Sequence, residues 1–167
     1  MIGRGLVTAV LVVALDQLSK AGIVALFAAY PPGHLVRLAP FFDLLLTRNR
    51  GISFGLFNNG DAANSLLFSV AAAVVIVVLI FWLKRVETRF LAVAIGLIIG
   101  GAAGNVIDRL IRGSVIDFLD FHLGSWHWPA FNVADSAICL GVAAMLLEGF
   151  VLRHTPPQAK GRGDSLS

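Results

Sequence analysis

The chain has 167 residues, which is enough for one domain and too few for two of ordinary size. Apolar residues make up 57% of it and charged residues 14%, and a soluble fold of this length could not bury so much apolar surface, so an ordinary soluble domain is excluded. The net charge of +3 comes from 13 Lys and Arg that are scattered or lie beside apolar runs, which indicates membrane flanks rather than a nucleic-acid-binding stripe, and no nucleic-acid partner is expected.

Four apolar segments approach the roughly 20 residues that a helix needs to cross a bilayer. They are Gly5–Phe27, Asn64–Leu83, Phe90–Ile107 and Val133–Leu152. The first is longer than the apolar region of a secretory signal peptide and lacks a small-residue cleavage site, so we expect it to be retained as a span. The short link between the second and third carries Lys84, Arg85 and Arg89. By the positive-inside rule this link, and with it both termini, is predicted to be cytoplasmic.

Two longer segments are expected on the opposite, extracytoplasmic side. Residues 30–63 mix apolar, aromatic and turn residues, a pattern that favours short β-strands or an extended hairpin. Residues 112–131 contain Trp126 and Trp128, as is typical at the headgroup level of a membrane. The Pro-, Gly- and Ser-rich residues 155–167 are predicted to form a disordered cytoplasmic tail behind a single four-helix membrane domain over residues 1–154.

Two features of the apolar segments concern packing. Gly96, Gly100 and Gly104 recur at every fourth position, which predicts a face on which another helix can approach closely. Cys139 is the one cysteine, which excludes an intrachain disulfide, and it is expected to be a buried packing thiol.

Polar side chains gather around the third and fourth apolar segments. Asp117 follows the third segment and Asp135 opens the fourth, so both carboxylates are expected at the same membrane surface. Polar residues in or beside the spans, with Asn49 and Gly51 of the first outer segment, are candidates to surround or support them. They are Asp16, Lys20, Asn49, Gly51, Asn105, Asp108, Arg109 and Asn132. Two carboxylates close enough to share a proton cannot both ionise, so one remains an acid and the other a base. Such a pair suits hydrolysis, because the base can take a proton from water while the acid polarises a carbonyl.

Spacing alone leaves other interpretations open. Asp16 and Lys20, at i and i+4, form either a structural ion pair or part of the site lining. Acidic residues within spans also suit a proton or ion relay, and polar groups can serve only to hold helices together. His122 and His127 lack further ligand-spaced His or Cys, so no metal site is expected.

Five motifs in this order resemble the signal peptidase II family, the bacterial lipoprotein signal peptidases. They are Asp16 with Lys20, Asn49-Arg50-Gly51-Ile52-Ser53-Phe54, Gly104-Asn105-Val106-Ile107-Asp108-Arg109, Val115-Ile116-Asp117-Phe118 and Phe131-Asn132-Val133-Ala134-Asp135-Ser136. The resemblance implies an intramembrane aspartic endopeptidase with four transmembrane helices and a small extracytoplasmic β-rich cradle from the first outer loop. It also implies that Asp117 and Asp135 are the catalytic pair and that no cofactor or metal takes part.

The substrate implied by the resemblance is a prolipoprotein whose lipobox cysteine already carries diacylglycerol. Cleavage on the amino side of this cysteine would release the signal peptide. The partners are then the lipid-modified substrate and membrane lipids, with the enzyme a monomer in the bacterial cytoplasmic membrane. The active site is expected near the extracytoplasmic surface.

Overall fold

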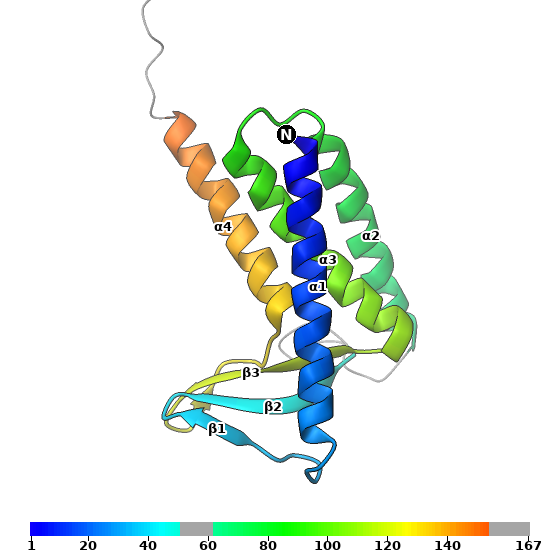
Figure 1. Cartoon of the computed structure of the whole chain (residues 1–167), viewed down its shortest axis with the longest axis vertical. Coiled ribbons are helices and arrows are strands. Elements are labelled where there is room, and N and C mark those ends of the chain that lie inside the picture. The colour runs from blue at the N-terminus through cyan, green and yellow to red at the C-terminus, as the bar shows by residue number, and fades with distance from the viewer. Residues whose placement is uncertain (51–61, 154–167) are drawn as a thin grey trace, which may run out of the picture.

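A computed structural model describes residues 1–50 and 62–153, which form four helices and four strands (Figure 1). In chain order they are α1 (Ile2–Phe27), β1 (Val36–Ala39), β2 (Phe42–Asn49), α2 (Ala62–Leu83), α3 (Arg89–Arg112), β3 (Val115–Leu123), β4 (Trp126–His127) and α4 (Val133–Arg153). Gly51 and the predicted disordered tail lie outside the described residues.

All four helices are long and apolar enough to cross a membrane, which confirms the prediction of four spans. Helix α3 is the central one and packs against α1, α2 and α4. In their most apolar windows 61% of α3 is buried but only 17% of α2 and of α4. The many exposed Leu, Val and Phe side chains of the outer helices are therefore the surface that lipid would cover.

The glycine face of α3 allows the close approach that was predicted. A Cβ atom at Gly100 would lie 2.6 Å from the carbonyl oxygen of Ala9 in α1. A Cβ atom at Gly104 would lie 2.6 Å from Oδ2 of Asp16. Glycine at these positions thus lets α1 bring a carboxylate directly against α3.

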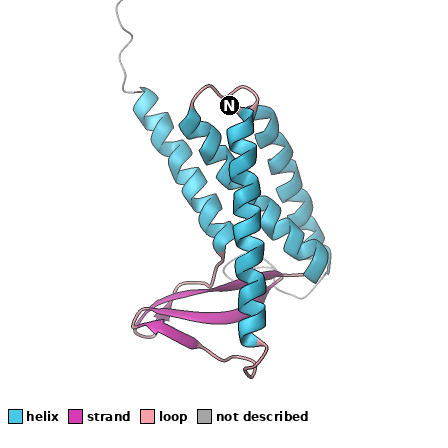
Figure 2. Ribbon diagram, in the orientation of Figure 1, coloured by secondary structure: helices cyan, strands magenta, loops and turns pink. Residues whose placement is uncertain are grey.

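The strands form one antiparallel sheet of order β1-β2-β3-β4 across one end of the helix bundle (Figure 2). Strands β1 and β2 are the predicted hairpin of the first outer segment. Strands β3 and β4 come from the second outer segment, for which no strand was expected. Ile116 and Phe118 of β3 pack against Ile23 and Phe27 of α1, which fixes the sheet to the bundle.

Two local expectations were wrong. Helix α3 does not end at Ile107 but continues to Arg112, where Gly113 closes it with a left-handed conformation (φ 71°). Arg109 and Arg112 are therefore residues of α3. Cys139 is exposed on α4 and not buried, because most of this helix faces away from the bundle.

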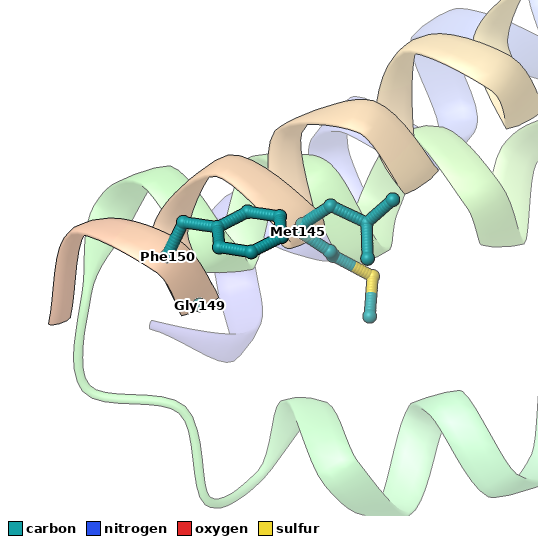
Figure 3. Close-up of a pocket in the computed structure, with 4 residues that line it drawn as sticks. Met145, Gly149 and Phe150 are labelled. Atoms are coloured by element: carbon teal, nitrogen blue, oxygen red, sulfur yellow. The ribbon is translucent and has the colours of Figure 1, made fainter. Parts of the chain in front are cut away.

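The far end of α4 carries an apolar hollow of about 190 Å³ (Figure 3). It is lined by Met145, Leu146, Gly149 and Phe150. These residues belong to the C-terminal turns of α4, whereas Asp135 lies in its first turn. The hollow is therefore separate from the polar residues singled out by the sequence.

Candidate active site

Asn132 is the centre of the polar cluster, at the point where β3, α3 and α4 meet. Its side chain is fully buried, and its Nδ2 donates to Oδ1 of Asp117 at 2.7 Å and to Oδ1 of Asn105 at 3.3 Å. Its Oδ1 accepts from the backbone N–H of Asp135 at 2.9 Å. The backbone N–H of Asn132 in turn donates to Oδ2 of Asp135 at 3.3 Å. This reciprocal pair is a capping box at the start of α4, so the motif that begins the helix also orients Asp135.

Asp117 lies in β3 and is 2% exposed. Its Oδ2 accepts from Nδ2 of Asn49 at 3.1 Å, and β2 presents Asn49 there because it pairs with β3. Burial and, to a lesser extent, the negative charge of Asp135 raise the pKa of Asp117 to about 6, against the hydrogen bonds from Asn49 and Asn132, which lower it. Asn132 donates to both Asp117 and Asp135, so the two carboxylates lie near one another.

Asp135 lies in the first turn of α4 and is partly buried. Its Oδ1 accepts from Nδ2 of Asn105 at 2.8 Å, in addition to the bond from Asn132 to Oδ2. A carboxylate at a helix N-terminus is also stabilised by the helix dipole. Asp117 and Asp135 are thus each held by two donors, and both are bonded to Asn132.

A buried ion network lies directly behind these carboxylates. Nζ of Lys20 is 2.8 Å from Oδ2 of Asp16 and 2.8 Å from Oδ2 of Asp108, and all three side chains are 0% exposed. Lys20 also donates to Oδ1 of Asn105 at 3.2 Å, which fixes the amide so that its Nδ2 faces Asp135. Oδ1 of Asp16 accepts from the backbone N–H of Ala134 at 3.0 Å, so α1 holds the first turn of α4.

The network includes two residues that sequence reasoning missed. Arg112 pairs with Asp108 and also donates to Oε1 of Gln17 at 3.2 Å. Gln17 donates to Oδ1 of Asp108 at 3.1 Å. The i, i+4 spacing of Asp108 and Arg112 could have predicted their ion pair. That prediction needs both residues to be helical, and the predicted span ended at Ile107.

Arg109 lies in the last turns of α3 and is partly buried. Its Nη1 donates to the backbone oxygen of Asn105 at 3.4 Å, and its guanidinium lies 5.8 Å from the ring centre of Phe68 in α2. The charges of Asp135, Asp117 and Asp108 all act on it. Arg109 therefore places a positive charge beside the two carboxylates.

The structure brings nine of the ten proposed site residues to one end of the bundle. They are Asp16, Lys20, Asn49, Asn105, Asp108, Arg109, Asp117, Asn132 and Asp135. Gly51 is the tenth and lies outside the described part of the chain. Within residues 1–50 and 62–153 no three His, Cys, Asp or Glu side chains are arranged to hold a metal ion.

Four apolar spans with two carboxylates tied through one asparagine define the class of the protein as a polytopic membrane protein with a candidate acid–base site at one end. A family model described as signal peptidase (SPase) II matches residues 8–151. The chain therefore belongs to the signal peptidase II family. Family membership and the four spans make it a bacterial inner-membrane protein.

Curated relatives agree with this assignment. The chain is 45% identical over 141 residues to the lipoprotein signal peptidase of Paraburkholderia phymatum, covering 84% of this chain and 83% of that protein. It is 44% identical over 139 residues to the lipoprotein signal peptidase of Burkholderia thailandensis, covering 83% and 82%.

Two similar solved structures are each described as a bacterial membrane enzyme. One has a TM-score of 0.78 at 27% identity and covers 100% of this chain and 96% of that one. The other has a TM-score of 0.76 at 30% identity and covers 93% and 96%. The arrangement of helices and sheet is therefore one already seen in solved membrane enzymes.

Proposed function

We propose that this protein is an aspartic endopeptidase that removes the signal peptides of bacterial prolipoproteins, with Asp117 and Asp135 as its catalytic pair. Family membership supports the reaction and the substrate class. The observation that carries the assignment of residues is the shared partner Asn132, which is bonded to both carboxylates. Residues 1–154 act in this proposal as one peptidase domain.

The chemistry follows from two carboxylates with one proton between them. The ionised member takes a proton from water, and the protonated member polarises the scissile carbonyl and later supplies a proton to the leaving amine. The donors of Asn49, Asn105 and Asn132 orient the pair. The positive charge of Arg109 can stabilise the oxyanion that develops as water attacks. No metal or cofactor enters this mechanism.

The substrate proposed here is a precursor whose lipobox cysteine carries diacylglycerol, cleaved on the amino side of that cysteine. A lipid-modified precursor stays in the bilayer, and the apolar faces of α2 and α4 provide a surface that its acyl chains can contact. The basic link with Lys84, Arg85 and Arg89 lies at the end of the bundle opposite the sheet. We therefore place both termini in the cytoplasm and the active site near the extracytoplasmic surface, in a monomer.

A cleavage assay with matched substrates tests this function. Purified enzyme is given a diacylglyceryl-modified prolipoprotein and its unmodified form of identical sequence. We expect cleavage immediately before the modified cysteine, with a preference of about a hundredfold or more for the lipid-bearing form, since acyl burial contributes directly to binding. Mass spectrometry of the products identifies the cleaved bond. Equal cleavage of both forms would contradict the substrate assignment, and absence of any cleavage would contradict the function.

The raised pKa of Asp117 predicts that kcat/KM falls on the alkaline side of the pH profile. As the pH rises through about 6, Asp117 loses its proton and both carboxylates become charged. We expect kcat/KM to fall above that pH, by about tenfold per unit once well past it, because the free enzyme then lacks the shared proton. The measurement is kcat/KM from pH 5 to 9 in detergent, and a constant value from pH 5.5 to 8 would contradict it.

The raised pKa of Asp117 also makes the stability of the protein depend on pH. The folded-state pKa lies above the value of about 3.9 for an unfolded Asp. The contribution of Asp117 to stability is therefore fully present below pH about 4 and is lost as the pH rises through about 6. Melting temperatures measured over the same pH range should decline less steeply in Asp117→Asn than in the wild type.

A further inference from the structure

A second cluster of ionisable side chains crosses all four strands of the sheet. We call it the ionic ladder, and it consists of Arg37 in β1, Asp43 in β2, Asp120 and His122 in β3, and His127 in β4. The ladder follows the register of the sheet, in which Arg37 is opposite Asp43, Asp43 is opposite Asp120, and His122 is opposite His127. The proposed mechanism uses none of these five side chains.

The ladder is joined by one short contact and two longer ones. Nδ1 of His127 lies 2.8 Å from Oδ2 of Asp120 and 3.1 Å from Oδ1. Nε2 of His122 is 3.4 Å from Oδ2 of Asp43, and the two imidazole rings stack with centroids 4.8 Å apart. Nε of Arg37 is 3.5 Å from Oδ1 of Asp43. The last two contacts are long, so the His127–Asp120 pair is the strongest link of the ladder.

The burial of its carboxylates makes the charge balance of the ladder important for the stability of the sheet. Asp43 is 1% exposed and Asp120 4% exposed, although they face each other directly across two strands. Like charges opposite one another destabilise a sheet. The two carboxylates and Arg37 sum to a charge of −1 when both imidazoles are neutral, so one protonated histidine makes the ladder neutral.

The His127–Asp120 pair also lies on the covalent path between the proposed catalytic residues. Asp120 is three positions after Asp117 on β3, and the chain after His127 leads to Asn132 and Asp135. Strand β4 has only two residues, both exposed. Beyond the β3–β4 pairing, Trp128 N–H donates to the oxygen of Phe121 at 2.8 Å, and Phe131 exchanges three backbone hydrogen bonds of 2.9 to 3.1 Å with Phe118 and Leu119. The His127–Asp120 pair adds a side-chain link to this backbone pairing.

We propose that His127 is a positioning residue, which by binding Asp120 keeps the β3–β4 hairpin closed and so maintains the placement of Asp135 relative to Asp117. This inference rests on the proposed function, because it assigns His127 a task in the same reaction. The pair holds most firmly when the imidazole is charged, since a charge-assisted hydrogen bond is stronger than a neutral one. The charged and titratable groups that face His127 are Asp120 and His122, with Asp43 and Arg37 behind them.

Three substitutions at one position test the proposal. His127→Gln removes the titratable group, and His127→Lys keeps a cation at pH values where an imidazole is neutral. The side chain of His127 is 47% exposed, so both replacements have room. His34→Gln is the matched control, because His34 stacks on Tyr30 and contacts no carboxylate among the described residues. His127→Ala shows the effect of losing the link altogether.

Two readouts are needed, kcat and KM on the lipid-modified precursor between pH 5 and 8, and hydrogen exchange of the amides of Trp128 and Phe131. For His127→Gln and His127→Ala at pH 6 we expect kcat to fall about tenfold with KM nearly unchanged, because misplacing a reacting group affects the chemical step. Both amides should exchange faster. His127→Lys, which keeps a donor for Asp120, should retain more of its kcat than His127→Ala at the same pH, and His34→Gln should behave as wild type.

The outcomes separate this inference from the proposed function. If Asp117→Asn abolishes cleavage but His127→Gln leaves kcat, its pH profile and the two amides unchanged, the positioning role is refuted and the function stands. If His127→Gln speeds exchange while Asp117→Asn cleaves normally, the hairpin link is real and the catalytic assignment fails. A change in KM alone would overturn the positioning role, since it would indicate a contact with substrate.

Discussion

Asp117→Asn and Asp135→Asn are each expected to reduce cleavage of a lipid-modified prolipoprotein by about 10⁴-fold or more, the size of loss seen when a member of a catalytic unit is removed. An amide has nearly the shape of a carboxylate but can neither accept a proton from water nor donate the acidic one. Asp117 accepts on both oxygens, from Asn132 and from Asn49, and an amide can accept from only one of them. We therefore expect a small loss of stability beside the large loss of activity.

The two effects are measured separately, by turnover and by melting temperature in detergent. Glu87→Gln is the matched control, because it neutralises an exposed carboxylate in the link at the other end of the bundle. It should leave both quantities unchanged. If either Asn variant retained wild-type turnover, the catalytic assignment would be wrong, whereas an unfolded variant would call for Asp→Ser at the same position, with the same expected loss.

The sequence was sufficient to predict the four spans, because length and apolarity alone decide whether a helix can cross a bilayer. It was also sufficient to predict that most of the polar residues lie close together. An Asp or Lys in such a chain is costly unless it is paired, so Asp16, Lys20 and Asp108 had to find partners, and the structure pairs them with one another.

The second half of the sheet could not be predicted because its local pattern is ambiguous. Val115, Ile116, Asp117 and Phe118 are all buried, so β3 lacks the alternation of apolar and polar residues that marks a strand with one exposed face. Its pairing with β2 joins residues far apart in the chain, such as Asn49 and Val115. Such contacts leave no signal in either segment alone.

The end of α3 was missed for a related reason. Asp108, Arg109 and Arg112 interrupt the apolar run after Ile107, so the predicted span stops there although Leu110 and Ile111 follow. In the structure the polar residues continue the helix because Asp108 finds Lys20 on α1 and Arg112 on its own helix. Gly113 ends the helix, and these partners stabilise the charged residues of its last turns, which places Arg109 on α3.

Lys20→Met is expected to have the largest effect on stability. Nζ of Lys20 is within 2.8 Å of carboxylate oxygens of both Asp16 and Asp108, and none of the three side chains is exposed. With Arg112 the network holds two cations and two carboxylates and is neutral. Removing Lys20 leaves one buried negative charge without compensation, which costs about 3–5 kcal/mol. We expect a large fall in melting temperature and in the yield of folded protein.

The double variant Asp16→Asn with Lys20→Met distinguishes lost charge balance from lost packing. It leaves Asp108 with Arg112, so the network is again neutral, and an amide at position 16 can still accept from the backbone N–H of Ala134. We expect the double variant to be more stable than Lys20→Met alone, a coupling that a double-mutant cycle measures directly. Lys84→Met, at an exposed lysine in the basic link, is the control and should melt as wild type. If the single and double variants melted at the same temperature, the loss would come from packing, and the ionic account of how α1 holds the first turn of α4 would be wrong.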